Sequence, residues 1–241
     1  KKISKSRAIL ARRKAGKTAI IQRLFNILWS ENGQAIPILI EIKEGNQWIM
    51  DLAKIYYETF LSHYLSFKLR KPQYCRPGLE LNEIKKIVEK EKMDVLISNI
   101  NTYESRVKNM EIDNTFFHVI ESPHYIASLT GDFFLVIIDE LQYLSEFIYR
   151  DEELKVKHAS LPGYYHAVSE SKIAPMLATG SYVGWLREVI AKYFEGGRLR
   201  QDDLNPDLTP EEGIECIYNY SDVTSIPVTE ESVTIINGLT H

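Results

Sequence analysis

A short segment near the start of the chain constrains the fold more than any other feature. Residues 11–18 read Ala-Arg-Arg-Lys-Ala-Gly-Lys-Thr, which fits the phosphate-binding loop pattern with alanine in place of the first glycine. Residues 8–10 are apolar and read as the end of a buried strand, and the residues after the loop have helical spacing, with apolar Ile20, Ile21, Leu24, Ile27 and Leu28. A strand, this loop and a helix, in that order, predict an α/β nucleotide-binding fold.

Each part of the loop has a physical role in this hypothesis. Backbone N–H groups would surround the α- and β-phosphates, Lys17 would neutralise charge on the β- and γ-phosphates, and the Thr18 hydroxyl would reach Mg²⁺. The positive N-terminal end of the helix adds to the attraction. The alternative is a basic turn that caps an ordinary helix. The residues expected to bind the nucleotide are Ala11, Arg12, Arg13, Lys14, Ala15, Gly16, Lys17, Thr18 and Ala19.

A second motif lies far along the chain, where six apolar residues at 133–138 precede Asp139 and Glu140. Such a continuous apolar run is typical of a strand covered on both faces, and ligands bind at the carboxyl ends of such strands. We interpret the run as a Walker B strand, with Asp139 holding Mg²⁺ and Glu140 as the general base that polarises the attacking water. The alternative is a strand that ends in a polar turn.

Two weaker signals follow the Walker B strand. Residues 173–178 read as a further strand, and the polar Thr179 or Ser181 at its tip is the candidate sensor that orients the water. A plain turn is the alternative there. Arg198, in a glycine-containing loop at 196–200, could contact the γ-phosphate as an arginine finger, in cis or from a neighbouring subunit, or could be a structural arginine.

Composition excludes several classes of protein. The 241 residues are 44% hydrophobic and 26% charged, and the longest purely apolar stretch is far shorter than the roughly 20 residues that span a bilayer. The start is polar and basic, unlike a secretory leader. Cys75 and Cys216 lie far apart and the six histidines have no ligand spacing, so we expect a cytoplasmic protein without a cysteine or histidine metal site.

Charge is distributed unevenly along the chain. Nine Lys or Arg residues precede the first acid, Glu31, whereas residues 201–241 contain nine acids and no Lys or Arg. The two regions could attract each other. A basic end is also found in nucleic-acid-binding proteins, although four of these nine cations lie within the phosphate loop itself.

The remaining periodicity predicts the order of the elements. A strand is expected at 36–42, a helix at 47–69, an amphipathic helix or helix pair at 81–110, a helix at 116–129 and another at 185–190. Thr209, Pro210, Glu211 and Glu212 resemble a helix start. We expect a core at 1–200 with a helical insertion around 65–110, and the beginning of a helical lid at 201–241 that stops short.

Taken together, these motifs resemble those of the archaeal-type P-loop ATPases, a group allied to the signal-transduction ATPases with numerous domains (STAND) and to AAA+ proteins. The resemblance rests on residues 12–18, 139–144, 178–181, 208–212 and 235–240. It implies a three-layer αβα sandwich with a parallel sheet of about five strands, followed by a small helical lid and often a C-terminal winged-helix domain. Two departures are Ala11 in place of glycine and the lack of a clear lid arginine after Gln201.

The leading functional hypothesis is a Mg²⁺-dependent ATP-hydrolysing molecular switch. ATP is favoured over GTP by the resemblance and by the absence of an Asn-Lys-x-Asp pattern. The alternative is a nucleotide-gated regulatory module with negligible turnover, which works through a further C-terminal domain, perhaps on DNA. A small-molecule kinase ranks third. The expected partners are ATP and ADP and either a second copy or another protein, with no membrane.

Overall fold

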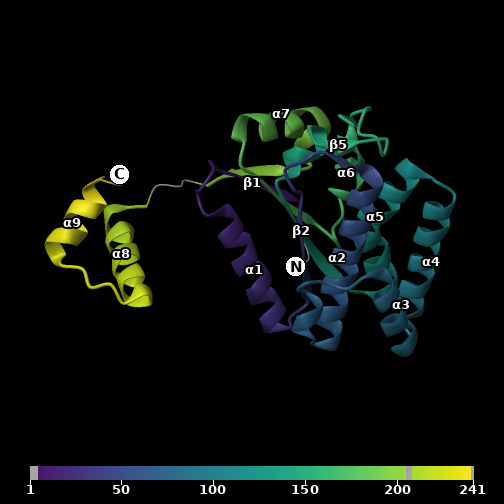
Figure 1. Ribbon diagram of the computed structural model, residues 1–241, viewed down its shortest axis with the longest axis horizontal. Coiled ribbons are helices and arrows are strands. Elements are labelled where there is room, and N and C mark those ends of the chain that lie inside the picture. Colours follow the sequence, from purple (N-terminus) through teal and green to yellow (C-terminus); the bar gives the residue numbers. More distant parts are fainter. Residues whose placement is uncertain (1–4, 205–207, 240–241) are drawn as a thin grey trace. The chain divides into compact units, whose positions relative to one another are not determined.

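Five parallel strands form the central sheet of the first structural unit (Figure 1). The computed structural model describes residues 5–204 and 208–239, and its strand order is β2-β4-β6-β1-β7. The predicted α/β fold with about five parallel strands is therefore confirmed. A separate two-stranded sheet pairs β3 (Gln47–Trp48) with β5 (Ile148–Tyr149). The strands of the main sheet are β1 (Arg7–Leu10), β2 (Ala35–Glu41), β4 (Phe133–Asp139), β6 (Met176–Gly180) and β7 (Arg200–Asp203).

Helices cover both faces of this sheet and make the three layers (Figure 1). On one face, Phe134 of β4 packs against Phe60 and Tyr64 of α2 (Ile49–Leu69), beside α5 (Ile112–Thr130). On the other face, α1 (Lys17–Glu31) buries Ile21 and Phe25 against Ile137. Neighbouring residues of β4 point to opposite faces, so a run that is apolar throughout can contribute to both layers.

The fifth strand, β7, is not among the strands predicted from the sequence. Its residues Arg-Gln-Asp-Asp are polar and exposed or half-buried, because β7 lies at the edge of the sheet and is held by backbone pairing with β1. An ion pair of 2.8 Å between Arg7 and Asp202 adds to this pairing. The strand carries no hydrophobic pattern, and only its position beside β1 makes it a strand.

The other edge of the sheet, at β2, is protected against pairing with another chain. Pro37 has no N–H to offer, and the backbone N–H of Leu39 donates to Nδ1 of His63 at 3.2 Å. His63 belongs to α2, so this helix both covers the sheet and caps its edge.

The helical stretch predicted at 81–110 is a helix pair, α3 (Leu81–Lys90) and α4 (Asp94–Lys108). Ile84 and Val88 of α3 and Leu96 and Ile100 of α4 are buried, as the apolar side of an amphipathic stretch would be. α3 packs on α2 and α4 packs on α5, so the pair extends the outer layer of helices. A capping box between Glu80 and Glu83 starts α3.

The segment between β4 and β7 contains one longer helix, α7 (Val183–Tyr193), in agreement with the helix predicted at 185–190. The connecting turns of the unit are short helices: η1 (Pro72–Tyr74), η2 (Leu141–Ser145), η3 (Leu161–Tyr164), α6 (Tyr165–Val168) and η4 (Glu195–Gly197). No helix in the described ranges is long and apolar enough to cross a membrane.

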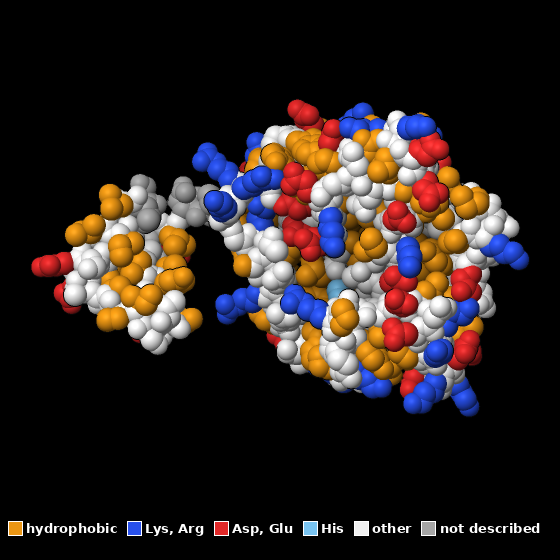
Figure 2. Space-filling view, in the orientation of Figure 1, with side chains coloured by type: hydrophobic (Ala, Val, Ile, Leu, Met, Phe, Trp, Pro, Cys, Tyr) orange, Lys and Arg blue, Asp and Glu red, His pale blue; other side chains and the backbone are white. Residues whose placement is uncertain are grey.

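Contacts divide the chain into one unit of residues 1–203 and a second of residues 204–241. The second unit contains α8 (Pro210–Thr224) and α9 (Glu230–Leu239), and Thr209 caps α8 in a capping box with Glu212, as its sequence predicts. Much of its apolar surface is exposed, as Figure 2 shows. Residues 201–203, which the sequence assigned to the lid, belong to β7 and to the first unit. Residues 205–207 and 240–241 of the predicted lid lie outside the described residues.

Candidate nucleotide site

The strand order brings the two predicted motifs together. β6 lies between β1 and β4, and the register pairs Ile9 of β1 with Thr179 and Ile138 of β4 with Ala178. All three strands are parallel, so their carboxyl ends lie on the same side of the sheet, where the strands end. The loop after β1, Asp139 at the end of β4 and Thr179 near the end of β6 therefore share one site.

The loop between β1 and α1 leaves the N-terminus of α1 open to an anion. Gly16 is the N-cap residue, with a left-handed φ of 77°, and the cap makes no side-chain hydrogen bond. The first turn of α1 contains no acid. Such an N-terminus presents unpaired backbone N–H groups and the positive end of the helix dipole, which is the arrangement that binds phosphate.

The backbone conformation of the loop shows why alanine is tolerated at position 11. Gly16 and Lys14 have positive φ, whereas Ala11 does not. Ala11 is also 4% exposed, so its position requires a small residue and no left-handed conformation. The replacement of the usual first glycine by alanine is therefore compatible with the shape of the loop.

Lys17 lies inside the loop. Its Nζ donates to the backbone carbonyl oxygens of Ala11 at 3.0 Å and of Arg12 at 2.8 Å, and the residue is 4% exposed. Burial lowers the pKa of the Lys17 ammonium, while the nearby carboxylates of Glu140 and Asp139 act in the opposite direction. The ammonium is thus held at the loop by neutral acceptors, which phosphate oxygens could replace.

Asp139 connects the three strand ends. One oxygen, Oδ2, accepts from the Thr18 hydroxyl at 3.0 Å, and the other, Oδ1, accepts from the Thr179 hydroxyl and from the Glu140 backbone N–H at 3.1 Å. Asp139 is 4% exposed and Thr179 is fully buried. The hydroxyl and carboxylate expected to hold Mg²⁺ are therefore already in contact.

This pair fits magnesium chemistry. The described residues include no group of three or more His, Cys, Asp or Glu side chains able to hold a metal ion. Mg²⁺ usually takes only one or two protein ligands and completes its shell with water and phosphate oxygens. The Thr18 hydroxyl and the Asp139 carboxylate suit that mode of binding and do not suit a metal held by protein alone.

Glu140 adopts a left-handed backbone, with φ 58° and ψ 44°, and its carboxylate is occupied by protein donors. Oε2 accepts from the Ser181 backbone N–H at 2.9 Å and from Nε2 of Gln142 at 2.5 Å, and Oε1 accepts from the Ser181 hydroxyl. Ser181 is one of the two candidate sensors in the sequence. In this structure it binds the predicted base.

Gly180 is required by this packing. A Cβ at position 180 would lie 2.1 Å from Oε1 of Gln142 and 2.8 Å from Cδ2 of Leu186. Gln142 is fully buried, and sequence reasoning assigned it no role. Its place in the stretch 139–144, three residues after Asp139, is the signal that could have indicated one.

Arg13 of the loop contacts three other segments near the same edge. Its guanidinium lies 3.3 Å from Oε2 of Glu44, 3.5 Å from the Tyr143 hydroxyl and 4.4 Å from the centre of the Tyr182 ring. Tyr143 also donates to Glu44 at 3.1 Å. The hydrogen bond with Tyr143 raises the pKa of Arg13 above its usual value. Tyr143 lies in the stretch 139–144 that carries the resemblance, whereas Glu44 and Tyr182 have no motif that would identify them in the sequence.

Arg198 is the predicted catalytic residue that the structure does not bring to this edge. Arg198 precedes the amino end of β7, and β7 runs parallel to β1. Arg198 therefore lies toward the amino ends of the strands, whereas the candidate site lies at their carboxyl ends. Its Nε pairs with Glu170 at 2.7 Å, and its Nη1 donates to the Glu195 carbonyl at 2.6 Å. These contacts are those of the structural arginine that the sequence offered as the alternative, and a role as an arginine finger stays a prediction.

Comparison with known proteins supports the fold. No protein-family model matches the sequence, and no curated protein sequence matches it. The Walker-type ATPase PABY2304 of Pyrococcus abyssi is similar in structure, with a TM-score of 0.54 and 15% identity over 95% of this chain and 57% of that chain. This chain therefore spans little more than half of that protein.

Two further solved structures show weaker likeness. The ORC2 protein of Aeropyrum pernix in its ADP form has a TM-score of 0.42 and 13% identity, covering 91% of this chain and 47% of that chain. Cdc6p from Pyrobaculum aerophilum has a TM-score of 0.42 and 10% identity, covering 90% and 43%. At 15% identity, the likeness to the Pyrococcus abyssi protein concerns the fold alone.

Proposed function

We propose that this chain is a P-loop ATPase that binds ATP with Mg²⁺ and hydrolyses it as a molecular switch. One observation carries the proposal: Lys17, Thr18, Asp139 and Glu140 converge at the carboxyl ends of neighbouring strands, beside an open helix N-terminus. These are the groups that phosphoryl transfer needs, because its catalysis consists mainly of positioning and charge stabilisation. The structural similarity to the Walker-type ATPase of Pyrococcus abyssi agrees with this assignment.

The binding roles follow from the contacts. Backbone N–H groups of residues 11–19 and the Lys17 ammonium bind the phosphates, and the Lys17 ammonium exchanges the loop carbonyl oxygens for phosphate oxygens. Thr18 and Asp139 would hold Mg²⁺, which supplies positive charge to the β- and γ-phosphates when bound. Thr179 keeps the Asp139 carboxylate in place through its buried hydroxyl.

We assign Glu140 the role of general base, which its carboxylate can perform only when the protein donors that bind it are released. A carboxylate bound by Ser181 and Gln142 has fewer lone pairs free to accept a proton from water. Hydrolysis therefore requires Glu140 to loosen these bonds when nucleotide binds. A γ-phosphate that draws Arg13 away from Tyr143 would act on the residue next to Gln142, which is one of the donors that bind Glu140.

The same contacts favour a second candidate function, a nucleotide-gated regulatory module with negligible turnover. If nothing releases Glu140 from Ser181 and Gln142, and if Arg198 stays with Glu170, the chain binds nucleotide without cleaving it. In that case its output would pass through the second unit or through a further domain or partner, such as another protein, a second copy or DNA. We place either function in the cytoplasm.

Steady-state phosphate release from ATP and GTP with Mg²⁺ tests the proposal. Lys17→Ala should abolish nucleotide binding and turnover, whereas Glu140→Gln should keep binding and reduce turnover by about 100-fold or more, the usual contribution of a general base. Lys86→Ala, which removes an exposed cation of α3 outside the loop, is the matched control. Binding without phosphate release in the parent protein would support the regulatory module, and turnover by Glu140→Gln at the parent rate would refute the assigned base.

A further inference from the structure

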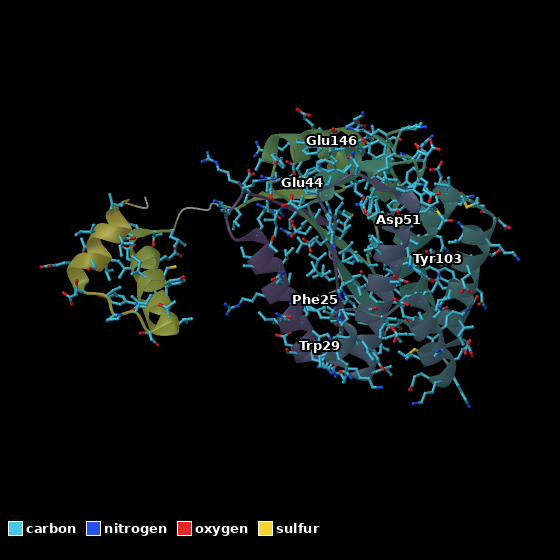
Figure 3. All side chains as sticks on the ribbon, viewed as in Figure 1. Phe25, Trp29, Glu44, Asp51, Tyr103 and Glu146 are labelled. Carbon is cyan, nitrogen blue, oxygen red and sulfur yellow. The ribbon has the colours of Figure 1, made fainter. Side chains whose placement is uncertain are left out.

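A second pocket lies away from the nucleotide site, between α1, the edge strand β2, α2 and η1. Its volume is about 370 Å³, within the range of small-molecule sites. Phe25 and Trp29 of α1 form one wall, and both belong to the side of that helix that faces α2 (Figure 3). Leu39 and Pro72 complete the apolar lining.

The aromatic wall is held in place by neighbouring side chains. The indole N–H of Trp29 donates to the Ser66 hydroxyl at 3.0 Å, and the guanidinium of Arg70 lies 3.9 Å from the centre of the Trp29 ring. The rings of Phe25 and His63 are 4.8 Å apart. These contacts fix a flat apolar surface before any ligand arrives, which reduces the entropy lost on binding.

His63 supplies a hydrogen-bond donor to this pocket. It is 8% exposed, and its Nδ1 accepts the Leu39 N–H at 3.2 Å, so in the neutral ring the proton is on Nε2. Burial, with the charge of Arg76 as a smaller cause, lowers the pKa of His63 to about 4, so the ring stays neutral near pH 7. Among the described residues, Nε2 has no hydrogen-bond partner, and His63 lines the cavity.

Charge in the pocket has one sign. Arg76 is the only charged residue in its described lining, and it has no ion-pair partner in the ranges 5–204 and 208–239. A cation would have no counter-charge there. The other polar groups of the lining, among them those of Gln22, Asn26 and Ser30, are uncharged. A single guanidinium suits a monoanion better than a phosphate dianion, and a planar carboxylate matches the guanidinium fork.

From this arrangement we infer that the pocket binds a small monocarboxylic acid with an aromatic or branched apolar body. The carboxylate pairs with Arg76 and accepts the Nε2–H of His63. The apolar body lies against Phe25 and Trp29. The inference does not depend on nucleotide hydrolysis.

Fluorine NMR of protein labelled with 5-fluorotryptophan tests this binding. The chain has three tryptophans, and a Trp29→Phe spectrum assigns the Trp29 resonance. Titration with phenylacetate should shift that resonance in a saturable way and leave those of Trp48 and Trp185 unchanged. Phenylacetamide, which has the same shape without the charge, should bind about tenfold more weakly, as expected when a charge-assisted hydrogen bond is lost.

Arg76→Gln should also weaken phenylacetate binding by about tenfold, because it removes the positive charge that pairs with the carboxylate. Arg76 is exposed, so this change should not disturb folding. Arg23→Gln removes an exposed cation of α1 outside the pocket and should leave binding unchanged. An unmoved Trp29 resonance, equal shifts with the amide, or full binding by Arg76→Gln would each overturn the inference.

Discussion

The hydrogen bonds of Glu140 lead to a prediction about Ser181. Ser181 donates to the Glu140 carboxylate twice, through its hydroxyl and through its backbone N–H, and Gln142 donates once. Ser181→Ala removes only the hydroxyl bond. If Glu140 must leave these donors before it can act as a base, the change destabilises the resting state and lowers the barrier to hydrolysis.

The magnitude follows from the kind of bond. A hydrogen bond to a charged group contributes about 1.5–3 kcal/mol, and the other two donors can take up part of the loss. A net gain of about 1.4 kcal/mol corresponds to a tenfold increase in rate. We therefore expect kcat for ATP hydrolysis to rise by up to about tenfold in Ser181→Ala, with little change in KM.

The assay is phosphate release at saturating ATP and Mg²⁺, together with a single-turnover measurement to separate chemistry from product release. Ser98→Ala, a serine exposed on α4, is the matched control and should behave like the parent protein. If Ser181 instead orients the attacking water as a sensor, kcat falls in Ser181→Ala. That fall would refute the idea that Ser181 restrains the base.

Two further predictions concern stability. Gly180→Ala places a Cβ 2.1 Å from Oε1 of Gln142 and should lower the free energy of unfolding by about 1–3 kcal/mol in urea denaturation, so an unchanged midpoint would contradict the packing described here. His63 has its pKa lowered from 6.5 to about 4, so its contribution to stability is complete above pH 6.5 and is lost as the pH falls toward 4. That loss reaches roughly 3 kcal/mol, and an NMR titration should find the His63 ring still neutral at about pH 5. A ring protonated there would contradict its burial.

The elements that could be predicted are those with a complete local signal. The loop at 11–18 stands between a strand and an amphipathic helix, and the apolar run at 133–138 is long enough to identify a buried strand without any neighbour. Thr209 and Glu212 form a capping box within four residues, so the start of α8 was predicted correctly. In each case the interacting residues are close in the sequence.

The strand β7 and the role of Arg198 show the opposite situation. β7 has no apolar pattern and exists because β1 offers a free edge, and the direction of β7 places Arg198 away from the loop. A glycine-flanked arginine near the end of a core looks the same in the sequence whether it binds a phosphate or Glu170. The direction of β7 places Arg198 beside Glu170 in this structure.

The sequence by itself determined the α/β class, the strand, glycine-containing loop and helix at 7–31, and the acidic end of β4, because these depend on periodicity and on short spacings. The tertiary structure decided which side chains meet at the edge of the sheet. Placing β6 between β1 and β4 brings Thr179 to Asp139 and Ser181 to Glu140, across about 40 residues of chain in each case. Those contacts are set by strand order, which results from the packing of the whole sheet and is not encoded in any local pattern.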